Sequence, residues 1–450
     1  MVHLRKSKSN NLLSDTQDVL LAHIQQGNHL TVALSGGVDS VVLLHSLVAL
    51  SKSMQFTLSA VHVNHGISNN AKLWSQFCGN LCHAYDIPIY VAYLQIRKDP
   101  GLSLEAVARE QRYRVFDRMQ ADYVVLAQHL DDQAETLLLQ LFRGAGIKGL
   151  SAMPVVRKQT SDNAPQILRP LLEISRSRIE AYAKQHRLNW IIDESNDSLA
   201  FNRNYLRHEI LPLLKKRYPN YPKTLLRTSR HLSEASSLLD ELAEIDRAQC
   251  LASDRLQVDH LRKLSSARAK NLLRYVLSQQ NINTPSTAKL DDILHQLLSA
   301  RTDNQLHISF GSAEIRCYKG AVYILSGKLQ HRAFQHHVWR GEQSMLLPSF
   351  SGSIHFTQVK GQGIDPQKLM NQLITIRARS GGEHLMPAHN RPRRSLKNLL
   401  QEASVPPWKR YSLPLLFCGE KLVWVPGIGI DYEFQVKSDE IGVLPIWDTE

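Results

Sequence analysis

Six residues between two apolar runs have the composition of a phosphate-binding loop. The segment SGGVDS at 35–40 follows an apolar run at 30–34 and precedes an apolar helix candidate at 41–50. Two adjacent glycines let the backbone turn with positive φ and approach a ligand closely. Consecutive N–H groups, the start of the next helix and the hydroxyls of Ser35 and Ser40 would then cradle a pyrophosphate. The alternative is a glycine-rich turn that merely begins a helix. The loop is not a Walker A motif, because no lysine occurs between Asn28 and Lys52.

A second candidate site lies in HLDDQAET at 129–136, which begins where a predicted strand ends and continues as an apolar helix. Asp132 and Glu135 are three residues apart, so they share one helix face. Two carboxylates near phosphates can hold Mg²⁺, or can bind and orient an ammonium group. The alternative is that Asp131 and Asp132 only complement the positive end of the helix. That explanation accounts for the first turn but gives Glu135 and His129 no role.

Two further positions carry side chains that suit a nucleotide. Arg109 and Arg112 lie at i, i+3 in a helix candidate over 103–119, where they could neutralise phosphate charge. A solvated charged face is the commoner explanation of such a pair. Asn64 or His65, at the end of a predicted strand, could hydrogen-bond the adenine or ribose, although an ordinary polar turn would look the same.

The elements that must position these residues alternate between strands and helices. Apolar runs at 30–34, 57–63, 89–94 and 123–127 predict strands, each separated by amphipathic stretches. This alternation predicts an α/β fold with a doubly wound parallel sheet. Ligands of such sheets bind beyond the carboxyl ends of the strands, so Ser35, Asn64 and His129 should converge on one crevice.

The length of 450 residues predicts two or three domains. We expect a catalytic domain at 1–215, a mainly helical domain at 216–330, a linker with some strand at 331–370 and a small basic α/β domain at 371–450. The helical domain ends in predicted strands at 306–310 and 313–324. A boundary near 217–220 is indicated by Pro219 and Pro222, after which leucines recur at helical spacing.

The composition is that of a globular protein that does not span a membrane. Hydrophobic residues make up 43% and charged residues 21%, and no segment approaches the roughly 18 apolar residues that a span needs. The basic, polar N-terminus lacks the apolar core of a signal peptide, so we expect a cytoplasmic protein. The five scattered cysteines favour reduced thiols. Cys78 and Cys82 are expected on a buried helix face rather than in a zinc site.

The charge balance predicts a polyanionic partner. The net charge is +13 and the isoelectric point is about 9.5. The segment 377–410 contributes eight basic residues against Glu383 and Glu402. Contacts of this kind position a nucleic acid through its phosphates without reading its bases. A solvated basic face is the alternative. The basic residues are Arg377, Arg379, Arg391, Arg393, Arg394, Lys397, Lys409 and Arg410.

Several motifs together resemble one enzyme family. SGGVDS resembles the PP-loop of the ATP pyrophosphatase superfamily, whose members split ATP between the α and β phosphates. HLDDQAET, Arg169-Pro170-Leu171-Leu172 and DESNDSLAFNRNYLRHEILP closely resemble tRNA(Ile)-lysidine synthetases, as do IRARSGGE, LKNLLQEASVPPWKR and LPLLFCGEKLVWVPGIGID near the C-terminus. The resemblance is dense over the first two hundred residues and weak in the middle. It implies an adenine nucleotide alpha-hydrolase-like sheet in the first domain.

The resemblance also implies a reaction. Members of that family adenylate the oxygen on carbon 2 of the wobble cytidine in a CAU anticodon, and free L-lysine then displaces AMP. ATP and Mg²⁺ are therefore the expected cofactors, and tRNA(Ile) bearing CAU and L-lysine are the expected partners, with no membrane. A homodimer is one candidate assembly, because the sequence does not fix the oligomeric state.

Roles carry over by position. The ATP-binding residues are expected to be Ser35, Gly36, Gly37, Val38, Asp39, Ser40 and His65, with Asp39 also contacting the metal. The catalytic residues are expected to be Arg112, Asp132, Glu135 and Arg203, where the two arginines stabilise developing phosphate charge. Three positions depart from the family pattern: Ser68 stands where arginine is common, Gln128 where histidine is frequent, and Glu194 where proline is usual.

Two other functions remain alternatives. A PP-loop tRNA thiolase also adenylates a base, but such enzymes typically use paired cysteines or a cysteine-held cluster, and Cys78 and Cys82 lie away from the crevice motifs. A tRNA-binding protein with a vestigial ATP site is the other, and the intact SGGVDS loop and acidic residues argue against it.

Overall fold

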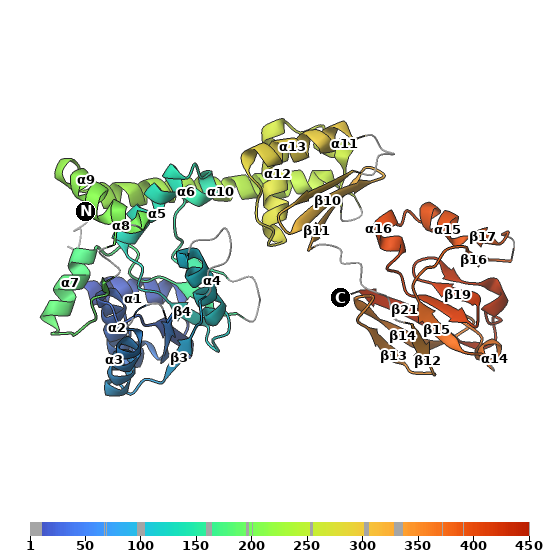
Figure 1. Ribbon diagram of the computed structural model, residues 1–450, viewed down its shortest axis with the longest axis horizontal. Helices are drawn as coiled ribbons and strands as arrows, with labels where there is room; N and C mark the ends of the chain where they lie inside the picture. The colour runs from blue at the N-terminus through green and yellow to red at the C-terminus, as the bar shows by residue number, and fades with distance from the viewer. Residues whose placement is uncertain are drawn as a thin grey trace, which may run out of the picture. The chain divides into compact units, whose positions relative to one another are not determined.

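The computed structural model describes residues 11–66, 68, 70–96, 104–158, 164–194, 198–199, 201–252, 255–300, 306–327, 336–370, 372–389 and 391–449. The chain forms two compact units, which meet along the sequence between Leu242 and Ala243. This division falls inside helix α10 (Tyr221–Cys250). Figure 1 shows the elements of both units.

The first unit is built around a six-stranded sheet in the order β3-β2-β1-β4-β6-β5. All neighbours are parallel except β5 (Val156–Arg157), which is antiparallel to β6 (Gln166–Leu168). The predicted parallel sheet is therefore confirmed, and its four predicted strands are present. They are β1 (His29–Ala33), β2 (Thr57–Asn64), β3 (Ile89–Tyr93) and β4 (Tyr123–Val125). The short strands β5 and β6 were not predicted.

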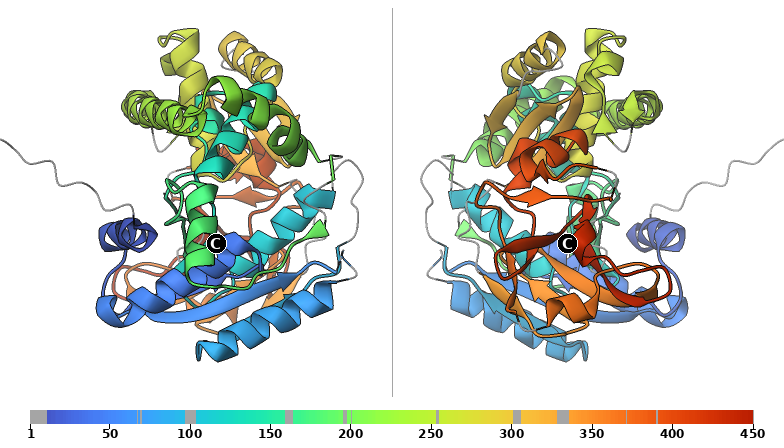
Figure 2. Two further views of the ribbon diagram at one scale, coloured as in Figure 1. Left: turned by 90° about the vertical axis from the view of Figure 1, so that its left-hand side faces the viewer. Right: turned by 90° about the vertical axis from the view of Figure 1, so that its right-hand side faces the viewer.

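Helices cover both faces of this sheet (Figure 1, Figure 2). Side chains of successive strand residues point to opposite faces, and Val124 and Val125 accordingly belong to two different apolar clusters. One cluster packs α1 (Leu12–His23), α2 (Val38–Met54), α3 (Ala71–Ala84) and α7 (Arg176–Gln185) against the sheet. The other packs α4 (Leu104–Phe116) through Phe116. Helices α5 (Leu130–Phe142) and α6 (Ile147–Leu150) follow β4.

A widened helical turn interrupts the helical segment that precedes α10. Helix α8 (Asn202–Tyr205) continues into a π-helical turn, η2 (Leu206–Ile210), and then into α9 (Leu211–Arg217). Leu211 N–H bonds to Leu206 O, five residues back. Pro212 has no N–H to continue the ordinary ladder, which favours a local change of hydrogen-bond register here. Such π turns are rare and occur frequently at functional sites.

The second unit begins with a small helical and β region. After β7 (Leu251–Ala252), β8 (Arg255–Leu256) and α11 (Val258–Leu261), helices α12 (Ser266–Gln279) and α13 (Thr287–Ser299) share a core with the antiparallel sheet β11-β10-β9. The strand predicted at 313–324 is two strands, β10 (Ala313–Tyr318) and β11 (Ala321–Ser326), while β9 spans His307–Phe310. Lys319 and Gly320 both have positive φ and form the tight turn between β10 and β11.

The described part of the C-terminal region contains two larger antiparallel sheets, in the orders β12-β15-β18-β19-β20 and β13-β14-β21, and a two-stranded one formed by β16 and β17. The stretch expected to be a linker instead supplies β12 (His337–Trp339), β13 (Ser344–Leu347) and β14 (Gly352–Lys360) to these sheets. Strand β12 pairs with β15 (Ile374–Arg377), and β14 pairs along its length with β21 (Ile441–Thr449). The described part of 331–370 therefore belongs to the C-terminal fold, because these strands find partners far along the sequence.

Short elements complete this region. They are α14 (Pro366–Leu369), β16 (His384–Leu385), β17 (Arg394–Ser395), α15 (Leu396–Glu402), α16 (Pro407–Arg410), β18 (Leu415–Cys418), β19 (Lys421–Val425), β20 (Gly429–Ile430) and η3 (Tyr432–Phe434). Across the parts of the chain that the structure describes, no helix combines the length and apolarity needed to cross a membrane.

Candidate active site

The SGGVDS loop connects the end of β1 to the first turn of α2. Gly36 has φ of +88°, so the turn uses the glycine as predicted. Ser40 braces the loop: its Oγ accepts a hydrogen bond from Gly36 N (3.1 Å) and donates one to Gly37 O (2.9 Å). Ser35 Oγ lies 3.1 Å from Ser40 Oγ. Val38 is buried in the core, so its side chain supports the loop rather than facing a ligand.

A segment far along the sequence, at Ile191, is hydrogen-bonded to the same loop. Ile191 N–H donates a hydrogen bond to Gly36 O (2.9 Å). A Cβ atom added to Gly36 would lie 2.6 Å from Ile191 Cδ1 and 3.3 Å from Cys78 Sγ. The carbonyl and the following N–H of one peptide plane point in opposite directions, so this bond also fixes the direction of the Gly37 N–H. Ile191 was not identified from the sequence, because its contribution is a backbone donor.

Replacing Gly36 with alanine is expected to weaken ATP binding at least about tenfold, because both the positive φ and the contact with Ile191 disfavour a side chain there. Equilibrium binding of ATP would measure this. Gly27→Ala is the matched control, since Gly27 has φ of +87° but no atom within 4 Å of an added Cβ. It should lose stability from backbone strain yet keep its ATP affinity. Equal losses of ATP affinity in both variants would contradict the role of the close contact.

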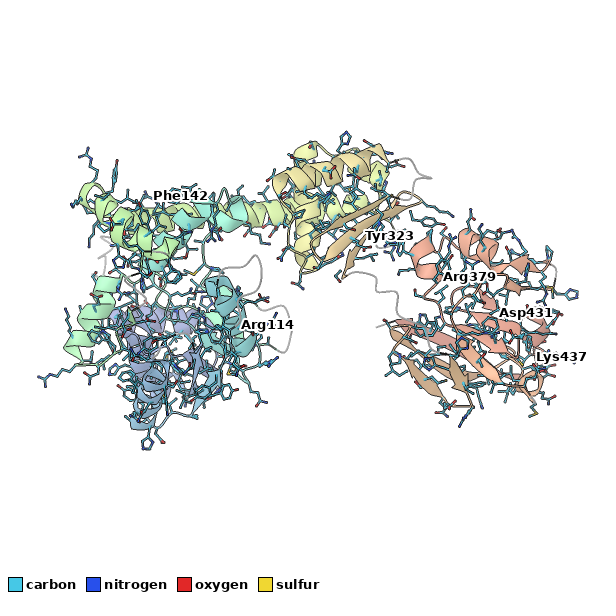
Figure 3. All side chains as sticks on the ribbon, in the orientation of Figure 1. Arg114, Phe142, Tyr323, Arg379, Asp431 and Lys437 are labelled. Carbon is cyan, nitrogen blue, oxygen red and sulfur yellow. The ribbon has the colours of Figure 1, made fainter. Side chains whose placement is uncertain are left out.

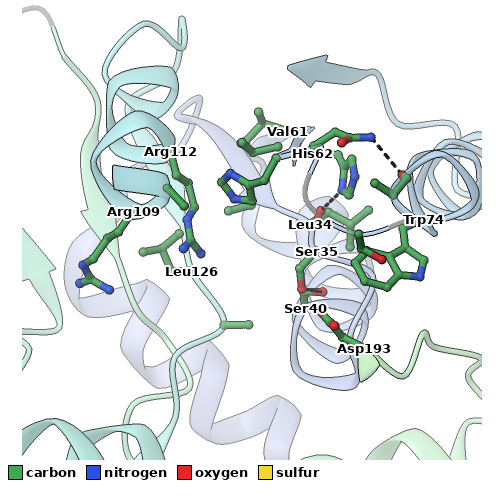
Figure 4. A pocket seen from close by; sticks show the side chains of 18 of the residues that line it. Leu34, Ser35, Ser40, Val61, His62, Trp74, Arg109, Arg112, Leu126 and Asp193 are labelled. Atoms are coloured by element: carbon green, nitrogen blue, oxygen red, sulfur yellow. Dashed lines mark hydrogen bonds between the residues drawn. The ribbon is translucent and has the colours of Figure 1, made fainter. Parts of the chain in front are cut away.

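A cavity of about 800 Å³ opens beside the loop at the carboxyl ends of β1, β2 and β4. The predicted residues Ser35, Asp39, Ser40, His65 and Arg112 all line it. Figure 4 shows Arg109 and Arg112 of α4 on one side of this cavity and Ser35 and Ser40 on the other. Of the three residues expected to converge, Ser35 and Asn64 line the cavity, whereas His129 does not; its Nε2 lies 3.7 Å from Oδ1 of Asp39, which does line it. The predicted Asp132, Glu135 and Arg203 are not among the lining residues either. The three positions that depart from the family pattern, Ser68, Gln128 and Glu194, also line the cavity.

Two buried polar atoms in this cavity have no hydrogen-bond partner among the described residues: Asp39 Oδ1 and His65 Nδ1. Buried polar groups are normally paired, so such atoms at a cavity wall indicate places where a ligand binds. Burial raises the pKa of Asp39, and the nearby His129 and Arg176 only partly oppose this rise. His129 Nε2 is 3.7 Å from Asp39 Oδ1, and Arg176 Nη1 is 3.5 Å from Asp39 Oδ2.

His65 is neutral at physiological pH. Burial lowers the pKa of His65 to about 4, and the positive charges of Arg112 and His62 contribute to the shift. His62 itself is fixed by a hydrogen bond of 2.8 Å between its Nδ1 and Leu34 O. A neutral imidazole can both donate and accept a hydrogen bond, which suits recognition of a base or a ribose.

The His65 pKa predicts a pH dependence of stability. Between about pH 6.5 and about pH 4 the unfolded chain binds a proton at His65 that the folded protein does not. The free energy of unfolding therefore falls as the pH falls through this window. His65→Gln should reduce that fall, while the other buried histidines keep part of it, and urea denaturation at pH 7.5, 5.5 and 4.5 would measure both. Identical pH profiles for the variant and the wild type would refute a lowered His65 pKa.

The predicted acidic pair, Asp132 and Glu135, lies on the first turns of α5 and is bound to two arginines. Glu135 is 1% exposed. Arg203 Nε donates to Glu135 Oε2 (2.7 Å), and Arg207 donates to both Glu135 oxygens, from Nε at 2.7 Å and Nη2 at 3.0 Å. Asp132 Oδ1 accepts more distant bonds from Arg203 (3.2 Å) and Arg207 (3.5 Å). Two carboxylates and two guanidinium groups thus form one charge-balanced cluster.

These charges stabilise one another despite burial. Burial alone would raise the pKa of Asp132, but His129 and Arg203 outweigh it and lower this pKa. Burial opposes the charges of both arginines as well, yet Asp132 and Glu135 raise the pKa of Arg203, and Glu135 and Asp132 raise that of Arg207. Arg207 was missed in the sequence. The sequence feature that could have indicated Arg207 is its i, i+4 spacing from Arg203. The π-helical turn at Leu206–Ile210 could not be predicted from the sequence.

His129 and Asp131 have structural roles that the sequence left open. His129 is the N-cap of α5: its Nδ1 accepts from Asp132 N (3.4 Å), while Asp132 Oδ2 accepts from His129 N (3.0 Å). The other ring nitrogen, Nε2, lies 3.7 Å from Asp39 Oδ1 and 3.5 Å from Asp132 Oδ2. Asp131 accepts a hydrogen bond from Arg176 N (2.8 Å). Asp132 therefore both caps the N-terminus of α5 and takes part in the ion-pair cluster.

Most of the eight basic residues predicted at the C-terminal region contact neighbouring groups. Arg379 pairs with Glu383, Arg393 with Asp431 and Glu433, and Arg394 with Glu402 (Figure 3 labels Arg379 and Asp431). Arg377 packs 4.0 Å above the Phe417 ring and pairs with Glu420, and Arg410 donates to Val405 O and Tyr318 Oη. Burial and the nearby Arg255 lower the pKa of Lys409. Arg391 and Lys397 are exposed.

The cysteines do not form a reactive pair. Cys78 and Cys82 are fully buried in the core of the first unit, as expected from their spacing. Cys78 does not lie away from the crevice motifs as expected, because its Sγ would be 3.3 Å from a Cβ added to Gly36 of the SGGVDS loop. Burial raises the pKa of the Cys78 thiol to about 12 and that of Cys82 to about 11. Because the thiolate is the nucleophile, these thiols are unsuited to sulfur transfer. Within the described residues, no group of three or more histidine, cysteine or acidic side chains is arranged to hold a metal ion.

Comparison with known proteins defines the class first. Residues 5–214 match the PP-loop domain family, in agreement with the parallel sheet and the loop that begins α2. Residues 256–323 match the TilS substrate binding domain and residues 374–447 the TilS substrate C-terminal domain. The first unit is thus a PP-loop domain.

Full-length relatives define the family. The chain is 52% identical over 428 residues to a tRNA(Ile)-lysidine synthase of Nitrosomonas europaea, covering 95% of this chain and 93% of that protein. It is 37% identical over 429 residues to the Coxiella burnetii protein of the same name, covering 95% and 94%. The chain belongs to the tRNA(Ile)-lysidine synthase family. A solved U34-tRNA thiolase, NcsA from Methanococcus maripaludis with its [4Fe-4S] cluster, is 18% identical with a TM-score of 0.43, covering 50% of this chain and 78% of that one.

Proposed function

We propose that this chain joins free L-lysine to carbon 2 of the wobble cytidine in the CAU anticodon of tRNA(Ile). The oxygen on carbon 2 attacks the α phosphorus of ATP and pyrophosphate leaves. An amino group of lysine then attacks carbon 2, the bond to that oxygen breaks, and AMP leaves. The observation that carries this proposal is a PP-loop cavity next to a buried cluster of two carboxylates and two arginines, in a chain related along its length to lysidine synthases.

The SGGVDS loop is the proposed site for the ATP phosphates. Ser35, Asp39 and Ser40 of this loop line the cavity. Mg²⁺ fits this site because Asp39 offers a buried carboxylate oxygen without a hydrogen-bond partner, and hard oxygen ligands suit this ion. Bound there by Asp39, the ion would neutralise phosphate charge. His65 is the proposed contact for the base or ribose of ATP, through its unpaired Nδ1.

The acidic pair is the proposed acceptor for the lysine ammonium group. Asp132 and Glu135 already accept hydrogen bonds from Arg203 and Arg207. An ammonium ion can therefore bind only if at least one guanidinium group moves. The adenylated intermediate carries a negatively charged phosphate that attracts a guanidinium group. We infer that Arg203 or Arg207 turns toward this phosphate while Arg112 contacts it from α4. This order would admit lysine after adenylation.

The second unit is proposed to bind the tRNA outside the anticodon. Its matches to two TilS substrate domains and its basic character support this role. All eight C-terminal basic residues remain in the proposed surface, with the exposed Arg391 and Lys397 best placed to bind phosphates and the paired arginines positioning them. Because ATP, lysine and tRNA are all present in the cytoplasm, we place the reaction there. A homodimer is retained as a candidate assembly that light scattering can test.

Radiolabelled lysine distinguishes the proposal from its alternatives. Purified protein with ATP and Mg²⁺ should release pyrophosphate and attach lysine to tRNA(Ile) bearing CAU, and not to methionine tRNA. Incorporation of sulfur instead of lysine would establish the thiolase alternative, which the raised thiol pKa values argue against. Binding of tRNA with no modification would identify a protein whose ATP site is vestigial.

A further inference from the structure

Three arginines gather around Tyr113, which lines the cavity together with Arg109, while Arg157 and Arg169 lie behind them. Arg157 Cζ lies 4.6 Å from the centroid of the Tyr113 ring, and Arg109 Cζ lies 5.3 Å from it. Arg169 is hydrogen-bonded to the Tyr113 side chain. The four residues come from α4, β5 and the residue after β6. We call Arg109, Arg157 and Arg169 the arginine cluster.

The arginine cluster places three guanidinium groups around the Tyr113 side chain. Burial would raise the pKa of Tyr113, but Arg109, Arg169 and Arg157 outweigh burial and lower it. Arg169 is 2% exposed and also donates to Pro154 O (2.8 Å) and Gln128 Oε1, which are neutral acceptors. Burial lowers the pKa of Arg169, Tyr113 opposes this shift, and the charges of Arg157 and Arg109 add to it. Like charges held this closely repel one another, and a bound anion would relieve that repulsion.

The position of the cluster separates it from the pyrophosphate site. Arg109 and Tyr113 line the same cavity as Ser35 and Ser40 but from α4, and Figure 4 shows Arg109 across the cavity from the two serines. Arg109 is exposed, whereas Arg157 is half-buried and Arg169 is buried, so the cluster runs from the protein interior to the solvent. A ligand anion can therefore approach from outside while the loop holds ATP.

We propose that Arg109 and Arg157, supported by Tyr113 and Arg169, bind a phosphodiester of the RNA strand beside the target cytidine. This inference rests on the proposed function, because it needs an RNA substrate in the cavity. A guanidinium group matches a phosphate through two parallel N–H bonds. An RNA phosphate is favoured over an ATP phosphate because the SGGVDS loop already provides the ATP site on the opposite wall. Backbone contacts of this kind would set how deeply the anticodon strand enters the cavity.

The test compares Arg109→Ala with Arg114→Ala. Arg114 is the matched control, since it lies on the same helix but pairs with Glu110 at 2.6 Å (Figure 3). Binding of tRNA(Ile) is measured by fluorescence anisotropy between 0.05 and about 0.3 M salt, without lysine. Loss of one phosphate contact should reduce the slope of log K against log salt by about 0.7, which weakens binding about fourfold at 0.15 M salt. Arg114→Ala should change neither value.

Further variants and an ATP-binding measurement distinguish an RNA phosphate from an ATP phosphate as the ligand of the arginine cluster. Arg109→Lys should keep most of the salt slope, because it keeps the charge, while Arg157→Ala should behave like Arg109→Ala. The dissociation constant of ATP, measured without tRNA, should stay the same in all these variants. Weaker ATP binding with an unchanged tRNA slope would overturn the proposal and assign the cluster to ATP. An equal loss of slope in Arg114→Ala would overturn it in favour of unspecific charge.

Failure of this inference can be distinguished from failure of the proposed function. If the wild-type protein forms lysidine but the salt slope does not depend on Arg109, this inference fails and the proposed function stands. If the wild-type protein forms no lysidine, the proposed function fails whatever Arg109 does to tRNA binding.

Discussion

Asp39→Asn should reduce pyrophosphate release about 10²- to 10³-fold while leaving the protein at least as stable as the wild type. Asp39 Oδ1 is buried without a hydrogen-bond partner, and burial raises the pKa of this carboxyl group. Its negative charge is thus under-compensated in the protein alone, and under the proposed function it would hold the cation that accompanies ATP. Asparagine keeps the shape but loses the charge. The variant should therefore be inactive without being destabilised, a combination that a purely structural aspartate would not give.

Asp15→Asn is the matched control for this experiment. Asp15 pairs with Arg178 of α7 at 2.8 Å, just as Asp39 approaches Arg176 of the same helix at 3.5 Å. It lies on α1 and does not line the cavity. Pyrophosphate release, ATP affinity with Mg²⁺ and with EDTA, and the melting temperature would be measured for both variants. A normal rate in Asp39→Asn, or a fall in melting temperature that accounts for the lost activity, would count against Asp39 as the metal contact.

Arg207→Ala is expected to show the second largest effect. It removes two of the three close hydrogen bonds to Glu135, which is almost fully buried. Breaking a buried ion pair from one side destabilises a protein by about 3–5 kcal/mol, because the remaining charge is left without its partner. We also expect lysine transfer to fall about 100-fold or more, as for loss of one preorganised electrostatic contact. Pyrophosphate release should fall less, because the SGGVDS loop is intact.

Two further variants separate the stability of the cluster from its chemistry. In Glu135→Gln/Arg207→Gln both partners become neutral, so part of the stability should return while lysine transfer stays low. Arg230→Ala is the control, because Arg230 pairs with Glu173 at the surface, where both side chains are more than half exposed. Exposed pairs contribute little, so its melting temperature should hardly change. Full lysine transfer in Arg207→Ala would contradict the prediction and show that Arg203 alone supports lysine transfer.

Local patterns predicted the core of the first unit well. The strands at 30–34, 57–63, 89–94 and 123–127 were found because buried parallel strands read as short apolar runs between helices. The spacing of Asp132 and Glu135 correctly placed both on one helix. Ser35, Asp39 and His65 were expected at strand ends and do line one cavity. These features depend on neighbours a few residues apart, which a single sequence shows directly.

The features that the sequence did not show depend on distant partners. Ile191 acts on Gly36 through a backbone N–H group that any residue except proline carries. Arg207 reaches Glu135 across 72 residues, and only the fold brings them together. Strand β14 is paired with β21, about 90 residues later, so its stretch looked like a linker. The C-terminal arginines were correctly seen as a charged set, but their carboxylate partners on other strands were not visible.

The hydrogen bond between Ile191 and Gly36 determines when the SGGVDS loop can be fixed during synthesis of the chain. A ribosome completes the SGGVDS loop early, but the segment that fixes its backbone lies 155 residues later. At about 5–20 residues per second, roughly 8 to 30 seconds of synthesis separate the two. During that time the nascent chain carries the nucleotide loop without the residue that holds it. The emerging chain therefore lacks the backbone contact that fixes Gly36 until most of the first unit has been synthesised.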